Sequence, residues 1–120
     1  MAWHTAGDKA DPASFEAETL KKLGMPEAIV MRHASPHFLH VFSGEGYSAG
    51  YYSYMWSEVL DADAFAAFEE TGNPFDPEMA EKLRTHVYSA GGSRDPGELY
   101  EAFRGRMPDA TAMLEKRGLA

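Results

Sequence analysis

Three Asp-Pro pairs divide this chain into short segments, and this punctuation limits what it can fold into. Asp11-Pro12, Asp76-Pro77 and Asp95-Pro96 each have the form of an N-cap carboxylate followed by proline at the first helical position. The aspartate side chain accepts a hydrogen bond from a backbone N–H that has no partner within the helix, and proline lacks only a donor that would be unpaired there. Asp109, which follows Pro108, is a looser version of the same signal. The pattern therefore predicts a series of helix starts.

Glycines stand where the same segments should end, as left-handed C-caps do. They are Gly24, Gly72, Gly91 with Gly92, Gly105 and Gly118. Between these marks the sequence predicts helices at about residues 12–23, 26–33, 49–71, 77–90, 96–104 and 109–117. No stretch alternates with a period of two for long enough to demand a sheet. We therefore expect an all-α fold, a multi-helix subdomain in which residues 1–120 form a single helical domain.

The segment from Ser35 to Gly50 does not follow this helical pattern. It carries Ser35-Pro36, two histidines and a run of serine and glycine. Each glycine costs a helix about 1 kcal/mol relative to alanine. We expect a mobile, Gly-rich loop that leads into the longest helix.

Composition excludes several classes of protein. The chain has 120 residues, 44% of them hydrophobic, which is enough for the core of one domain, and a net charge of −8, which argues against a nucleic-acid partner. It has no cysteine, so it holds no disulfide or thiolate metal site. No apolar run approaches the roughly 18 residues that cross a bilayer. We expect a cytoplasmic protein without a membrane partner.

Four of the six tyrosines lie within eight residues. At 100° per residue, Tyr47, Tyr51 and Tyr54 share a narrow arc with Glu58, and a separate apolar arc is predicted to be the core stripe of the helix. The apolar arc consists of Tyr52, Met55, Trp56, Val59 and Leu60. The tyrosine arc is a row of phenol hydroxyls that follows, in the sequence, a loop that carries His40. Phenols and imidazoles donate hydrogen bonds to a carbonyl oxygen or an oxyanion.

Simpler interpretations of these residues stay open. A tyrosine row at helical spacing is commonly half-buried packing with its hydroxyls in water. His37 and His40 have a spacing that would suit a metal, but no carboxylate or thiol stands at matching spacing, so packing or capping is the favoured interpretation.

A longer stretch carries a specific resemblance. Residues 37–65 read HFLHVFSGEGYSAGYYSYMWSEVLDADAF, and Gly-Gly-Ser-Arg-Asp-Pro (91–96), Phe-Arg-Gly-Arg-Met-Pro (103–108) and Leu-Glu-Lys-Arg-Gly-Leu (114–119) follow in order. Together they resemble the C-terminal region of the zinc peptidase family that contains thimet oligopeptidase, oligopeptidase A and bacterial peptidyl-dipeptidase. The sequence around the tyrosines is most similar to that of the peptidyl-dipeptidase branch. The resemblance covers nearly the whole chain.

The resemblance has one large departure. That family binds zinc through His-Glu-x-x-His and a downstream Glu, and the motif's Glu activates the zinc-bound water. No histidine in this chain is followed by glutamate. The resemblance therefore implies a C-terminal fragment of a larger metallopeptidase, with zinc in the parent enzyme and no metal bound by this fragment, which alone should be inactive. Met1 would then be an internal methionine.

The resemblance also implies roles for individual side chains. Tyr54 matches the tyrosine that donates to the oxyanion as water attacks the scissile carbonyl. Tyr47 matches a loop tyrosine that hydrogen-bonds the substrate backbone, and His40 matches a histidine that contacts a substrate carbonyl. Tyr51 matches more weakly, as a second donor or a wall of the cleft.

Two hypotheses follow. In the first, the chain is part of a zinc-dependent peptidyl-dipeptidase or oligopeptidase that hydrolyses short peptides, with the missing part of its own chain as partner and some self-association of the fragment. In the second, it is a stand-alone helical module that binds a peptide without catalysis.

Overall fold

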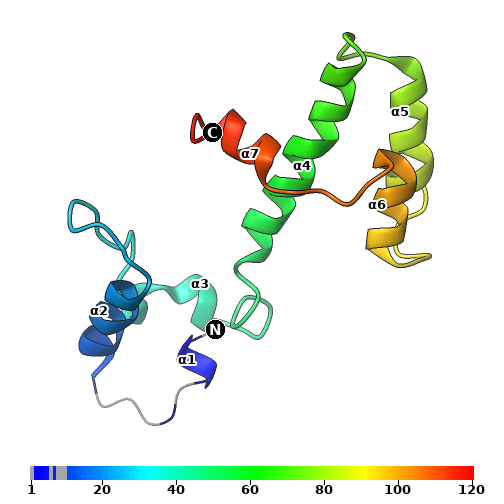
Figure 1. Ribbon diagram of the computed structural model, residues 1–120. Helices are drawn as coiled ribbons and strands as arrows, with labels where there is room; N and C mark the ends of the chain where they lie inside the picture. Colours follow the sequence, from blue (N-terminus) through cyan, green and yellow to red (C-terminus); the bar gives the residue numbers. More distant parts are fainter. Residues whose placement is uncertain (1, 6, 8–10) are drawn as a thin grey trace. The chain divides into compact units, whose positions relative to one another are not determined.

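The computed structural model of the chain describes residues 2–5, 7 and 11–120, and every regular element in this part is helical (Figure 1). The predicted all-α class is therefore confirmed. The chain folds as two compact units, residues 1–52 and residues 53–120. The single-domain organisation stays a prediction.

The first unit is built from short helices joined by long connections. They are α1 (Ala2–Thr5), α2 (Pro12–Lys22), the 3₁₀ turn η1 (Ser35–His37) and α3 (Leu39–Phe42). Ser35 joins η1 to α2, because its N–H and hydroxyl both donate to the Glu16 carboxylate, at 2.7 and 2.8 Å. The Trp3 indole donates to the Ser35 hydroxyl at 3.2 Å, and its ring packs 4.4 Å from that of Phe15.

One prediction for this unit is wrong, and a second holds only for part of its range. The helix expected at 26–33 is instead a single turn, in which the Ile29 N–H donates to the Pro26 carbonyl, followed by extended backbone. No capping side chain precedes Pro26, and Ile29 and Val30 are 58% and 86% exposed, so packing does not support a helix there. The loop expected at 35–50 contains η1 and α3, and only residues 43–52 form bends and turns before α4.

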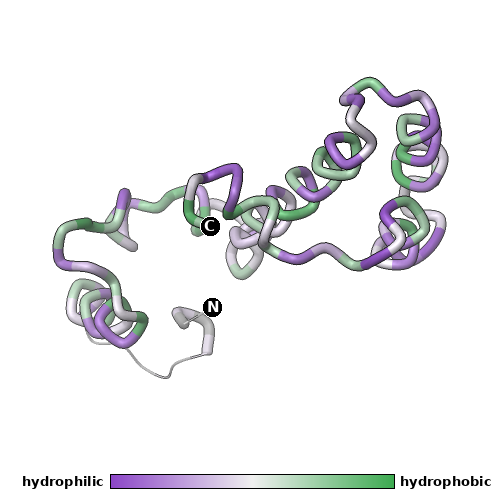
Figure 2. The backbone as a smooth tube through the Cα atoms, turned by 45° about the horizontal axis from the view of Figure 1, so that its top comes forward, coloured by the Kyte–Doolittle hydropathy of each residue, from purple (hydrophilic) through white to green (hydrophobic). Residues whose placement is uncertain are grey.

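The second unit is built around one long helix. It contains α4 (Ser53–Glu70), α5 (Pro77–Leu83), the π-helical turn η2 (Arg84–Tyr88), α6 (Pro96–Arg104) and α7 (Thr111–Lys116). The predicted helix 77–90 is therefore α5 continued by η2, and the predicted helix 49–71 begins only at Ser53, after the Gly50 turn. Ala67, Tyr100 and Phe103 form the buried centre, with partly buried apolar side chains from α4, α5 and η2 around it. Figure 2 shows hydrophilic and hydrophobic residues interleaved along these helices, as expected where each buries one face.

The predicted helix caps are confirmed. Asp11, Asp76 and Asp95 each accept hydrogen bonds from backbone N–H groups in the first turn of the helix that follows. Five of the six predicted glycines, all except Gly92, have positive φ, and Gly105 is the left-handed C-cap of α6 with φ of 83°. A side chain at that φ would be strained, so glycine there allows α6 to stop and the chain to turn towards α7.

The predicted core stripe of α4 is wrong in its first half. Tyr52, Met55 and Trp56 are 67%, 57% and 61% exposed, whereas Val59 and Leu60 are partly buried. The core lies against the later turns of α4, where Ala64 and Ala67 contact it. The first turns extend beyond this core, so their apolar side chains have no interior to enter within the described part of the second unit.

A buried carboxylate joins α4 to the end of α6. Asp63 is 1% exposed and accepts hydrogen bonds from the Tyr100 hydroxyl (2.8 Å), Arg104 Nε (3.2 Å) and Arg106 Nη2 (2.6 Å). Arg104 is itself buried and also pairs with both oxygens of Glu70, at 2.8 and 2.5 Å. The Arg104 hydrogen bonds lower the pKa of Glu70. Every donor faces an acceptor, which is the condition under which a buried charge is tolerated.

Removal of this carboxylate should be costly. We expect Asp63→Ala to lower the free energy of unfolding by about 3–5 kcal/mol, because it leaves buried arginine and tyrosine donors without their acceptor. Urea titration of the purified chain measures this. Asp61→Ala is the matched control on the same helix, since Asp61 is 74% exposed and pairs only weakly, at 3.4 Å, with Lys116. A loss below about 1 kcal/mol in both variants, as for a surface pair, would contradict the assignment.

The Tyr100 hydroxyl should make stability sensitive to alkaline pH. Burial, followed by the hydrogen bond to Asp63 and its negative charge, raises the pKa of Tyr100 above its ordinary value of 10.0. Below pH 10 the phenol is neutral in both states and its contribution is complete, and as pH rises above 10 the unfolded chain ionises first, so stability falls. We expect Tyr100→Phe to cost about 1–3 kcal/mol at neutral pH and to flatten that alkaline fall. Urea titrations from about pH 7 to about pH 11 measure both effects.

The control for this prediction is Tyr88→Phe, which changes a side chain that is 74% exposed. An equal flattening of the alkaline fall in Tyr88→Phe would show that Tyr100 is not its source.

Candidate functional site

Three of the four predicted site residues come together in the first unit. The ring centroids of His40 and Tyr47 are 4.7 Å apart, those of His40 and Tyr51 are 5.5 Å apart, and those of Tyr47 and Tyr51 are 5.9 Å apart. Each pair meets edge to face, at interplanar angles of 63°, 76° and 72°, which is a favourable aromatic geometry. We call these three residues the ring cluster.

The backbone between α3 and α4 makes this cluster possible. His40 lies in α3, and the chain then turns twice within residues 43–52. The Ser48 hydroxyl donates to the Glu45 carbonyl at 3.0 Å, and the Gly50 N–H donates to the Tyr47 carbonyl at 3.4 Å. A Cβ at Gly50 would lie 3.3 Å from the Gly46 carbonyl oxygen, so glycine allows this close approach. The turns return Tyr51 to the imidazole of His40.

Further aromatic contacts extend the cluster towards the preceding loop. Phe38 packs edge to face on Tyr51, with centroids 4.8 Å apart, and His33 stacks on Phe38 at 5.3 Å. The sequence interpretation gave neither residue a role in the site. The signal that would have found Phe38 is its place two residues before His40, between the two predicted histidines. Phe38 therefore supports the tyrosine that the sequence assigned least securely.

The cluster offers hydrogen-bond donors next to apolar ring surface. His40 is exposed, Tyr51 is 40% exposed and Tyr47 is half-buried. The ring contacts restrict how each side chain rotates, and restricted donors bind a carbonyl oxygen at a smaller entropic cost than mobile ones. Such a set can hydrogen-bond the carbonyl oxygens of a peptide without a fixed charge.

The fourth predicted residue, Tyr54, belongs to the second unit. It lies in the first turn of α4 and is 51% exposed. Its neighbour by helical spacing is Glu58, one turn later, and Arg117 holds the Glu58 carboxylate with two hydrogen bonds of 2.8 and 2.5 Å. Arg117 follows the end of α7, 59 residues away along the chain. Sequence reasoning placed Glu58 on the tyrosine arc but did not foresee its partner.

The described residues do not form a metal site. Within the described part of the chain, no three His, Asp or Glu side chains gather as a metal would require. His37 lies in η1 and His40 in α3, so the two predicted candidates stand on separate elements. The residues that the structure describes therefore offer no ligand set that fits a zinc ion.

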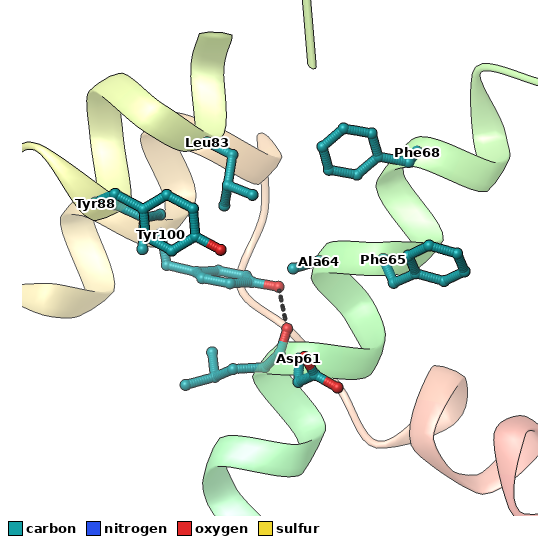
Figure 3. A pocket seen from close by; sticks show the side chains of 9 residues that line it. Asp61, Ala64, Phe65, Phe68, Leu83, Tyr88 and Tyr100 are labelled. Carbon is teal, nitrogen blue, oxygen red and sulfur yellow. Dashed lines mark hydrogen bonds between the residues drawn. The ribbon is translucent and has the colours of Figure 1, made fainter. Parts of the chain in front are cut away.

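The second unit also has an apolar hollow of about 330 Å³ beside α4 (Figure 3). Phe65 and Phe68 of α4 line one side, Leu83 and Tyr88 line the other, and the Tyr100 hydroxyl donates to the Leu60 carbonyl at 3.2 Å. None of the predicted site residues lines it. Its lining is mainly apolar.

Known proteins resemble this chain over most of its length. It is 51% identical over 85 residues to oligopeptidase A of Escherichia coli, covering 70% of this chain and 12% of that protein. It is 36% identical over 124 residues to dipeptidyl carboxypeptidase of the same organism, covering 99% of this chain and 18% of that protein. A probable cytosolic oligopeptidase A of Arabidopsis thaliana is 44% identical over 87 residues, covering 68% of this chain and 12% of that protein.

These proportions show that the chain spans less than a fifth of the length of these relatives. The sequence around the tyrosines favoured the peptidyl-dipeptidase branch, but the comparisons do not distinguish the branches. The dipeptidyl carboxypeptidase aligns over more of the chain, and oligopeptidase A aligns with higher identity. The family itself is shown, because the model of peptidase family M3 matches residues 1–119. The chain belongs to peptidase family M3, a family of metallopeptidases.

Proposed function

We propose that this chain is the C-terminal part of a zinc-dependent peptidyl-dipeptidase or oligopeptidase that hydrolyses short peptides. The observation that carries the proposal is the ring cluster of His40, Tyr47 and Tyr51, which gathers polar donors in a chain of family M3. The small share of the relatives' length that the chain covers supports its being one part of a longer enzyme.

Each residue has a distinct role in this proposal. Tyr54 donates its hydroxyl to the oxyanion that forms as water attacks the scissile carbonyl. Tyr47 hydrogen-bonds the substrate backbone, and His40 donates to a substrate carbonyl. Tyr51 is a second donor or a wall of the cleft. Donors held in place before the reaction stabilise developing charge without reorganisation, which is commonly the largest single contribution to catalysis.

The zinc and the catalytic base lie outside this chain in the proposal. The described residues do not fit a metal, and no histidine is followed by glutamate, so His-Glu-x-x-His is absent. The rest of the polypeptide is thus the partner that completes the active site, and the chain by itself binds no zinc.

We place the enzyme in the cytoplasm, without nucleic-acid or membrane partners. The Arabidopsis relative is named a probable cytosolic protein, and the net charge of −8 would repel nucleic acid. Within the described residues, none of the helices combines the length and the hydrophobicity that a bilayer crossing requires. Apolar side chains such as Trp56 and Met55 are exposed, and we expect the isolated chain to self-associate through them.

The role of Tyr54 is tested in the full-length enzyme that contains this sequence. We expect Tyr54→Phe to lower kcat by about 10²–10³, the usual cost of removing one oxyanion donor, with a far smaller change in KM and the same zinc content. Steady-state kinetics with a blocked peptide and metal analysis measure these quantities. Tyr52→Phe is the matched control, because Tyr52 lies two residues away and on a different arc of the sequence. A kcat for Tyr54→Phe within about threefold of the parent value would contradict the role.

The location of the zinc site is tested with the 120 residues alone. We expect the purified chain to contain less than stoichiometric zinc and to leave a blocked peptide intact at any added zinc concentration, because the ligands and base are missing. Atomic absorption and chromatography of the peptide measure this. One zinc per chain together with turnover would overturn the proposal. Peptide binding without cleavage, in the full-length protein as well, would favour the stand-alone binding module instead.

A further inference from the structure

The turn of α4 that carries Tyr54 is held from outside the core. Residues 53–57 are all exposed, and the core contacts of α4 begin only at Leu60. The first turn of a helix lacks half of its internal hydrogen bonds, and exposed turns open more readily than buried ones. A contact that fixes this turn therefore constrains the direction of the Tyr54 side chain.

Glu58 supplies that constraint one turn after Tyr54. In an α-helix the N–H of residue 58 bonds the carbonyl of residue 54, and their side chains lie on one face. The Glu58 carboxylate accepts from Arg117 Nε and Nη2 at 2.8 and 2.5 Å, a two-point geometry that fixes direction as well as distance. Glu58 is the first residue of α4 that is not exposed.

Arg117 is itself well placed to hold α4. Its N–H donates to the carbonyls of Met113 and Leu114 at 3.1 and 3.2 Å, and Met113 is buried at 6% exposure. Gly118, with φ of 68°, ends the helix directly afterwards. The arginine therefore projects from a packed helix end and not from a loose tail.

We propose that the Glu58–Arg117 pair positions the Tyr54 hydroxyl by fixing the first turns of α4 to the end of α7. Both are positioning residues, since they act through Tyr54 and not on the substrate. This inference rests on the proposed role of Tyr54. The neighbouring Lys116–Asp61 pair does not serve this purpose, because it is a single contact of 3.4 Å between side chains that are 61% and 74% exposed.

The experiment uses the full-length enzyme, the Tyr54→Phe variant described above and four further variants beside the parent. Arg117→Met removes the charge and the hydrogen-bond donors of the pair and keeps an unbranched, flexible side chain. The charge-swapped double variant Glu58→Arg with Arg117→Glu restores it in reverse. Lys116→Met is the matched control, and Arg117→Met combined with Tyr54→Phe tests whether the effect passes through the phenol.

Kinetics give the first readout. We expect Arg117→Met to lower kcat about tenfold with KM within about twofold, since misplacement of a reacting group by 1 Å can cost about 10²-fold. The charge-swapped variant should recover most of the loss, and Lys116→Met should match the parent. In the Tyr54→Phe background, Arg117→Met should change kcat by less than about twofold, because residues that act through one group are not additive.

Hydrogen exchange gives a readout that does not depend on activity. Amides of residues 54–60 should exchange about two- to fivefold faster in Arg117→Met than in the parent, as expected for loss of one well-aligned surface pair. The charge-swapped variant should restore protection, and Lys116→Met should leave it unchanged.

The outcomes separate the two proposals. If Tyr54→Phe leaves kcat unchanged while the exchange results hold, the role of Tyr54 is wrong but the pair still fixes α4. If Tyr54→Phe lowers kcat while Arg117→Met alters neither kcat nor exchange, the positioning proposal is overturned and the function stands. Equal losses of kcat for Arg117→Met with and without Tyr54 would also overturn it.

Discussion

The second unit depends on one buried carboxylate. Asp63 lies in the middle of α4 and accepts hydrogen bonds from Tyr100 and Arg104 of α6 and from Arg106 beyond it. A charge removed from water in this way is strongly unfavourable unless its partners are complete, so the carboxylate selects the arrangement in which all three donors reach it. Apolar packing of Tyr100 and Phe103 adds burial but is less directional.

This interaction makes α4 the element to which the rest of the unit is fixed. Along one helix, Glu58 pairs with Arg117, Asp63 with Arg104 and Arg106, and Glu70 with Arg104. The Glu58–Arg117 pair is partly exposed and contributes little to stability by itself, but it acts on a helix that the buried carboxylate already orients. A surface ion pair can then set the direction of the helix end that it contacts. In the proposal, the Tyr54 hydroxyl depends on that direction to reach its acceptor.

The ring cluster of the first unit depends on residues that are close together in the sequence. His40, Tyr47 and Tyr51 lie within twelve residues of one another, and two turns between them suffice to bring their rings together. Nothing distant is needed for these contacts. The helical arc that grouped Tyr54 with Tyr47 and Tyr51 does not hold, because α4 begins only at Ser53. Their substrate-binding roles remain a proposal that comes from the family resemblance.

The sequence by itself determined the local structure of this protein. Asp-Pro pairs predicted the helix starts and glycines predicted the left-handed ends, because a cap is satisfied by atoms within a few residues of itself. The helix predicted at 26–33 does not form, because no capping side chain precedes Pro26 and the local signal for a helix start is therefore missing.

Burial was decided only by the tertiary structure. Trp56 was predicted to lie in the core and is 61% exposed, whereas Asp63, to which the sequence assigned no role, is 1% exposed. Helical periodicity shows which residues share a face, but it carries no information on which faces meet. That depends on partners about 40 to 60 residues away, Tyr100 and Arg104 for Asp63 and Arg117 for Glu58, whose approach is set by the packing of whole helices.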